Sequence, residues 1–334
     1  LMNYKEDARF SEKYKQEYLD GLYALIEQRE KEGESVREKA DLFENAATHR
    51  ENFKKMLGWP LINPPQDKVP QPTSELLSKE DGSSIYRMSF EFLNGVHMDG
   101  LFFKHDGDEI RPFSILQHGG EGTPEIISGV LGDTSNYNDM AMRVFREGIN
   151  VFAPQLVLWN KEKYGAEYDR ASIDAKLKRV GSSITAVEIY AITKILDYFE
   201  NQPYVKNLGM VGLSYGGFYT LFTHAIDTRL KAAISCSFFN ERKKYTWCDW
   251  SWGNAAYTYS DAEIACLTYP RKFWIQIGDN DDLFDVKSGI REFERFKKLS
   301  SAKEQWVIFT VFSGTHEFNK DNSDVEAFAK ELWK

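Results

Sequence analysis

The strongest chemical signal in the sequence is a serine flanked by glycines, Gly212-Leu213-Ser214-Tyr215-Gly216. Apolar residues at 208–211 predict a buried strand before it, and residues 218–225 predict a helix after it. A sharp strand-to-helix turn of the pattern G-x-S-x-G raises the serine hydroxyl above the sheet, and the small flanking residues relieve crowding. A phosphate-binding turn would place a lysine where Phe218 stands. We therefore expect Ser214 to be a nucleophile.

A serine nucleophile needs a base to take its proton. His316 follows the predicted last strand, at the sheet edge where catalytic groups of open α/β sheets gather. His224 lies on the helix after the serine and faces away from it, and His118 precedes two glycines. The other three histidines belong to the N-terminal region or to an early hairpin: His49, His97 and His105. The sequence thus favours His316 as the base.

The base in turn needs a carboxylate to orient it. Four aspartates follow the predicted strand 273–277, namely Asp279, Asp281, Asp282 and Asp285. We expect Asp281 to be the acid, because three residues beyond Gly278 the loop can turn back toward His316, and Asp282 is the alternative. A calcium loop is disfavoured because Leu283 and Phe284 occupy its third ligand position and its glycine position.

Acyl transfer also needs N–H donors for the oxyanion. The N–H of Tyr215, directly after the serine, is the first candidate. The second is the N–H of Gly120 in the run His118-Gly119-Gly120, with Glu121 as the alternative, and His118 would hold this loop by hydrogen bonding. The competing interpretation of the run is a plain glycine turn.

The elements that must position these groups alternate between strands and helices. Asn94-Gly95 predicts a hairpin between Tyr86–Phe92 and Val96–Lys104. Further strands are expected at 113–117, 149–154, 208–213, 230–236, 273–277 and 305–312, and helices at 183–201, 215–225, 287–299 and 324–333. This order predicts an α/β fold with a mostly parallel, twisted sheet of about eight strands and helices on both faces.

Residues 1–75 are expected to form an N-terminal helical extension, with 76–334 as the main domain. Tyr14, Tyr18, Leu22 and Ile26 recur at helical spacing. The pattern Ser35–Glu38 predicts the capping box of a second helix that ends near Leu57. Residues 60–73 carry five prolines and predict an extended connector.

Two insertions are expected in the main domain, near 156–181 and 240–262. The first is polar and long, which suggests a lid. The second holds an aromatic cluster that could wall an acyl or sugar pocket, although packing of the insertion onto the core is the favoured interpretation. The cluster consists of Tyr245, Trp247, Trp250, Trp252, Tyr257 and Tyr259.

Composition disfavours two classes of partner. The 334 residues include 42 Lys and Arg against 51 Asp and Glu, a net charge of −9, which disfavours nucleic acid and anionic membranes. Three cysteines without a CxxC pair predict neither disulfides nor a metal site. No apolar run is long enough to span a membrane, and the polar start at 1–10 shows no signal peptide, so a cytoplasmic location is expected.

These residues resemble the α/β-hydrolase superfamily, over about residues 84–330. Within it the chain is most similar to bacterial esterases related to acetyl xylan esterases and dienelactone hydrolases. Besides the serine turn, the resemblance rests on residues 50–58, 195–199, 227–233, 269–271 and 278–284. It implies the same roles for Ser214, Asp281 and His316. Dienelactone hydrolases proper use a cysteine nucleophile, so Ser214 implies a different substrate.

The predicted activity is that of a serine hydrolase that cleaves a small-molecule carboxylic ester through an acyl-enzyme, without metal or cofactor. A carbohydrate acetyl esterase is the more specific form of this prediction. One alternative is a serine peptidase of the prolyl-oligopeptidase type, although the short N-terminal extension cannot build a propeller. Another is a hydrolase-like binding protein without turnover. The N-terminal helices could serve an interface in a homo-oligomer.

Overall fold

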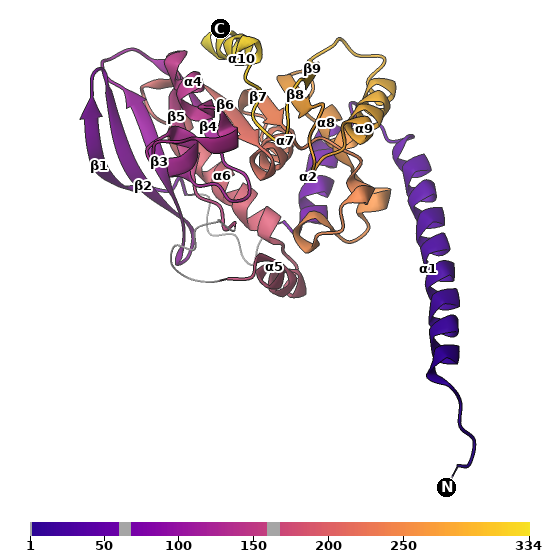
Figure 1. Ribbon diagram of the computed structural model, residues 1–334. Helices are drawn as coiled ribbons and strands as arrows, with labels where there is room; N and C mark the ends of the chain where they lie inside the picture. Colours follow the sequence, from indigo (N-terminus) through magenta and orange to yellow (C-terminus); the bar gives the residue numbers. More distant parts are fainter. Residues whose placement is uncertain (1, 60–67, 159–167) are drawn as a thin grey trace.

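The computed structural model describes residues 2–59, 68–158 and 168–334. Within these ranges, nine strands form one sheet in the order β1-β2-β3-β5-β4-β6-β7-β8-β9 (Figure 1). The pairs β1–β2, β2–β3 and β3–β5 are antiparallel, and all other neighbours are parallel. The strands are β1 Thr73–Glu80, β2 Ser83–Leu93, β3 Val96–His105, β4 Arg111–Gln117, β5 Asn150–Pro154, β6 Val205–Leu213, β7 Leu230–Cys236, β8 Lys272–Gly278 and β9 Val307–Phe312.

Helices cover both faces of this sheet (Figure 1). They are α1 Ala8–Arg37, α2 Ala46–Leu57, α3 Pro124–Ser128, α4 Met140–Arg146, α5 Arg170–Arg179, α6 Ile184–Glu200, α7 Tyr215–Ile226, α8 Asp261–Cys266, α9 Val286–Leu299 and α10 Ser323–Trp333. Short 3-10 turns are η1 Ser135–Tyr137, η2 Arg242–Lys244, η3 Cys248–Trp250 and η4 Ala255–Tyr257. The predicted fold class and the four predicted helices of the main domain are confirmed.

The central strands are buried on both faces, because successive side chains point into two separate cores. In β4, Phe113 and Ile115 enter the core beneath α6 and α7. Their neighbour Leu116 enters the opposite core, which α4 and α10 close. The ring of Phe199 from α6 stacks on Phe113 with centroids 3.9 Å apart. This double burial holds the carboxyl ends of β4, β6, β8 and β9 in fixed positions.

The predicted helix start at Ser35–Glu38 is wrong. Ser35 lies inside α1, and its hydroxyl donates to the carbonyl of Lys31 at 3.1 Å. Tertiary contacts of Gly33 and Arg37 carry α1 through this point, and the second helix begins only after Asn45. Its end at Leu57 is confirmed, since Gly58 follows in a left-handed conformation with φ of 98°.

The sheet has one strand more than the sequence predicts. The added strand β1 pairs with β2 at the sheet edge, and nearly all of its residues are exposed. An exposed edge strand needs no apolar alternation, so its sequence carries no strand signal. Most of the predicted connector, at 60–67, lies outside the described residues, as does 159–167 of the predicted lid.

Candidate active site

Ser214 occupies the turn between β6 and α7. Its backbone has φ of 61° and ψ of −120°, a strained conformation for a residue with a side chain, and its N–H donates to Cys236 O at 2.9 Å. A Cβ on Gly212 would collide with the backbone of Gly216, and one on Gly216 would collide with Gln117 O. Both glycines of the motif are thus required by close backbone packing.

His316 and Asp281 meet at the carboxyl ends of β8 and β9. His316 Nδ1 lies 2.9 Å from Asp281 Oδ2, and the Asp281 side chain is fully buried. The other carboxylate oxygen accepts from the N–H groups of Leu283 at 2.9 Å and Phe284 at 3.0 Å. Three donors fix the carboxylate, so it can hold the imidazole in one orientation.

The neighbouring aspartates have other contacts. Asp279 Oδ1 accepts from Gly314 N at 3.0 Å and so ties the two loops together. Asp285 accepts from Lys287 N at 3.2 Å and caps α9. Asp282 is exposed, and no hydrogen bond or ion pair within the described ranges involves its side chain. Of the four, the structure brings Asp281 to His316.

The loop that carries His316 is fixed to the sheet through its backbone. The backbone carbonyl of His316 accepts a hydrogen bond from Asn136 Nδ2 at 2.9 Å, and Phe318 N donates to Asn136 O at 2.8 Å. The next carbonyl, that of Glu317, accepts from Ser237 Oγ at 3.1 Å. Ser237 directly follows Cys236, the acceptor for Ser214 N, so the serine turn and the His316 loop lie at one sheet edge.

In the part of the chain that the structure describes, Ser214 and His316 do not form a hydrogen bond. The contact between nucleophile and base is often long in unliganded hydrolases and tightens when substrate binds. The side chain of His316 is 14% exposed, and Ser214 is 9% exposed. Both groups can therefore be reached from solvent, while Asp281 cannot.

The predicted oxyanion loop lies directly against the serine. A Cβ on Gly119 would stand 2.8 Å from Ser214 Cβ, and Gly119 N donates to the hydroxyl of Tyr137 at 2.8 Å. Across the described residues, the N–H of Gly120 has no hydrogen-bond partner. Glu121 adopts φ of 59°, which completes the tight turn. One N–H in this loop is thus available close to Ser214.

His118 holds this loop as a neutral imidazole. Burial lowers its pKa from 6.5 to about 4. Its Nε2 accepts from Leu156 N at 2.9 Å, so Nδ1 carries the hydrogen and donates to Gly119 O at 2.8 Å. These two bonds use both ring nitrogens and agree with the predicted supporting role.

Three of the other histidines have contacts away from Ser214. His224 is buried against Arg271 at 3.0 Å, and burial lowers its pKa well below 6.5. His49 contacts the hydroxyl of Tyr259 at 2.8 Å, and His105 stacks on Phe145.

A buried ionic network, not predicted from the sequence, lies behind Ser214. Arg170 Nε donates to Asp249 Oδ2 at 2.7 Å, and its Nη1 donates to Glu188 Oε1 at 2.6 Å. The hydroxyl of Tyr215 donates to the same Asp249 oxygen at 2.9 Å. Burial raises the pKa of Tyr215 above its usual range, so the hydroxyl keeps its proton. The residues of this network are far apart in the sequence and share no motif, so no local sequence pattern predicts the network.

Comparison of the sequence with models of known protein families shows the family of this chain. A sequence model of the dienelactone hydrolase family matches residues 125–334, well over half of the chain. The chain belongs to the dienelactone hydrolase family. Since a dienelactone is a cyclic carboxylic ester, this membership places the chain among the carboxylic ester hydrolases. The comparison with curated protein sequences gave no match.

Solved structures show the α/β-hydrolase fold. Acetyl Xylan Esterase 1 from Thermoanaerobacterium sp. JW/SL YS485 is 14% identical with a TM-score of 0.60, covering 90% of this chain and 98% of that one. A glucuronoyl esterase from Solibacter usitatus is 13% identical with a TM-score of 0.60, covering 85% and 92%. A candidate acetyl xylan esterase from Bacteroides fragilis is 14% identical with a TM-score of 0.63, covering 80% and 74%.

The aromatic cluster of the second insertion divides in this family member between core and surface. Trp250, Trp252 and Tyr259 are buried, while Trp247 is 44% exposed. The ring of Trp250 lies 5.0 Å from that of Tyr215 and stacks on Phe284 at 5.6 Å. Phe284 in turn lies 5.6 Å from the ring of His316. Trp250 thus forms part of the wall behind Ser214 and His316.

Among the described residues there is neither a membrane-spanning helix nor a metal-binding group. Their helices include none with the length and apolar character of a membrane span. Nor do their His, Cys, Asp and Glu side chains form a group of three that could hold a metal ion.

Proposed function

We propose that this family member is a serine esterase whose catalytic groups are Ser214, His316 and Asp281. The observation that carries the proposal is the 2.9 Å hydrogen bond between His316 Nδ1 and Asp281 Oδ2, made at the sheet edge where the strained Ser214 turn also lies. A buried carboxylate bonded to Nδ1 leaves Nε2 as the base, because the hydrogen is held on the other ring nitrogen.

In the proposed reaction, Ser214 Oγ attacks the ester carbonyl while His316 Nε2 takes its proton. The tetrahedral oxyanion is held by the N–H groups of Tyr215 and Gly120. His316 then returns the proton to the leaving alcohol, and the acyl group remains on Ser214. Water, activated by His316, attacks the acyl-enzyme and releases the acid. Asp281 stays ionised and stabilises the imidazolium.

The proposed substrate is a small ester with a short acyl group, of which an acetylated sugar is the proposed example. Ser214 is only 9% exposed, and the rings of Tyr215 and Trp250 close the space behind it. This crowding supports acetyl over longer acyl chains. Two of the similar structures are described as acetyl xylan esterases, which supports a carbohydrate alcohol.

The experiment compares Ser214→Ala with the parent on p-nitrophenyl acetate. Loss of the nucleophile is expected to lower kcat by about 10⁶-fold. Activity near that of the parent would contradict the proposal. A panel of p-nitrophenyl esters from acetate to octanoate, together with acetylated xylose, then tests the acyl and alcohol preferences. A cytoplasmic location and the absence of nucleic-acid partners stay predictions.

A further inference from the structure

Helix α1 leaves the body of the molecule as a long arm, with the N-terminus at its far end (Figure 1). Its 30 residues span about 45 Å at the helical rise per residue. Only Gly33 and Arg37, both in its last turns, are buried. Most of the arm therefore projects into solvent.

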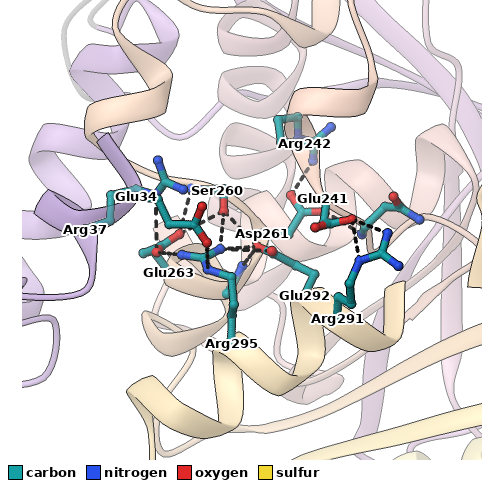
Figure 2. Close-up of polar contacts among 12 residues, drawn as sticks. Glu34, Arg37, Glu241, Arg242, Ser260, Asp261, Glu263, Arg291, Glu292 and Arg295 are labelled. Atoms are coloured by element: carbon teal, nitrogen blue, oxygen red, sulfur yellow. Dashed lines mark hydrogen bonds and ion pairs between the residues drawn. The ribbon is translucent and has the colours of Figure 1, made fainter. Parts of the chain in front are cut away.

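The C-terminal end of α1, where the arm joins the body, is held by a buried ionic cluster (Figure 2). Arg37 Nε lies 3.3 Å from Glu263 Oε1, and Glu34 Oε1 lies 3.3 Å from Arg295 Nε. Arg37 also donates to the carbonyl of Ala256, which lies so close to Gly33 that a Cβ there would collide with it. The Glu263 side chain is fully buried. These contacts from α8, α9 and η4 fix the direction of the arm.

The projecting part of α1 carries an exposed apolar surface. Phe10, Tyr14, Tyr18 and Leu22 follow one another at intervals of four, which places them along one side of the helix. Tyr18 is 72% exposed, and Phe10 is 53% exposed. The full set, called here the arm surface, is Phe10, Tyr14, Tyr18, Leu19, Leu22, Tyr23, Leu25 and Ile26. Such a continuous apolar patch on a soluble chain marks an interaction surface.

We propose that the arm surface binds the arm of a second copy of this chain, with the two α1 helices antiparallel across a two-fold axis. If the arm surface is covered, each chain buries about 800 Å², from typical aromatic and aliphatic side-chain areas. Two chains then bury about 1,600 Å², the standard size of a specific protein interface. The two-fold axis lets one patch serve both chains.

The charges of the arm favour a second copy over a highly charged partner. Residues 8–26 include three basic and three acidic side chains, so this segment is neutral although the chain as a whole carries −9. A neutral surface of mixed sign neither repels its own copy nor attracts a nucleic acid. Gly21, three residues after Tyr18, has nothing within 4 Å of its Cβ position and allows two backbones to approach closely.

Sedimentation equilibrium on the full chain, from about 1 to about 100 μM, tests this proposal. The parent is expected to have the mass of two chains. Tyr14→Glu with Tyr18→Glu should give the mass of one chain. The control, Arg9→Gln with Lys13→Gln, lowers the net charge by the same amount on the side of the helix away from the arm surface and should stay dimeric.

A second variant, Tyr14→Ala with Tyr18→Ala, removes the same two aromatic side chains but preserves the helix, because alanine is the best helix former. It should weaken the dimer at least about 100-fold. Far-UV circular dichroism and hydrolysis of p-nitrophenyl acetate should match the parent in every variant, since none of these residues is near Ser214. A parent that remains monomeric at every concentration, or glutamate and alanine variants that remain dimeric, would overturn the proposal.

Discussion

The hydroxyl of Tyr215 donates to Asp249 Oδ2 at 2.9 Å, directly behind the turn that presents Ser214. Arg170 reaches the same oxygen at 2.7 Å, and its guanidinium lies 5.3 Å from the centre of the Tyr215 ring. Three segments from α5, η3 and the start of α7 thus meet at one buried carboxylate. The contact ties the second insertion to the helix that begins at the serine.

Asp249→Asn is expected to destabilise the fold by about 3 kcal/mol, because it leaves the buried Arg170 with one carboxylate partner fewer. Urea unfolding monitored by tryptophan fluorescence measures the change. The matched control is Asp139→Asn, which removes the exposed ion pair to Arg146 at 2.9 Å. That change should cost less than about 1 kcal/mol. Equal losses in the two variants would contradict the role given to the network.

Asp281→Asn is expected to lower kcat on p-nitrophenyl acetate by about 10⁴-fold, because an amide cannot stabilise the imidazolium of His316. Asp282→Asn is the control, and it should stay within about 2-fold of the parent because this exposed side chain makes no bond to His316. Tryptophan fluorescence of both variants should match the parent. If Asp282→Asn were the damaging change, the acid would have to be reassigned to Asp282.

Prediction from the sequence was most successful where a short motif is compatible with only one backbone conformation. The turn at Ser214 requires small residues at 212 and 216, so its backbone conformation could be predicted. It was equally sound for the apolar strand β7, whose bounds match the prediction. The choice of Asp281 over Asp282 could be argued only from loop length, and the role itself stays a prediction that the hydrogen bond to His316 supports.

Sequence reasoning failed where distant contacts override local signals. The capping pattern at Ser35 is a valid helix start, but Gly33 and Arg37 contact a segment about 220 residues away, and these contacts extend α1 past Ser35. Asn136 and Tyr137, which hold the His316 and Gly119 loops, belong to a short polar stretch without periodicity. Nothing in that stretch indicates a supporting role.

The stability of the fold is expected to depend on pH through His118. Burial lowers the pKa of this histidine from 6.5 in the unfolded chain to about 4 in the folded one. Below pH 6.5 the unfolded chain binds a proton that the folded chain rejects, so the free energy of unfolding decreases as the pH falls from 6.5 to 4. The shift corresponds to about 3 kcal/mol.

His118→Gln should reduce this decrease, because an amide can donate to Gly119 O and accept from Leu156 N without titrating. Urea unfolding of both proteins at pH 7, 5.5 and 4.5 gives the comparison. His97→Gln is the control, since His97 is exposed on β3 and should leave the profile unchanged. Parallel profiles for parent and His118→Gln would show that this histidine does not contribute.

Gly119→Ala should impair catalysis more than it impairs folding. The added methyl would stand 2.8 Å from Ser214 Cβ and 3.4 Å from its Oγ, so the loop that carries Gly120 must move away from Ser214. A displacement of about 1 Å at a reacting group can cost about 100-fold, which is the loss of kcat expected here. Gly253→Ala is the control, because nothing lies within 4 Å of its Cβ position. Comparable kcat values for the two variants would mean that the Gly119 loop does not shape the site around Ser214.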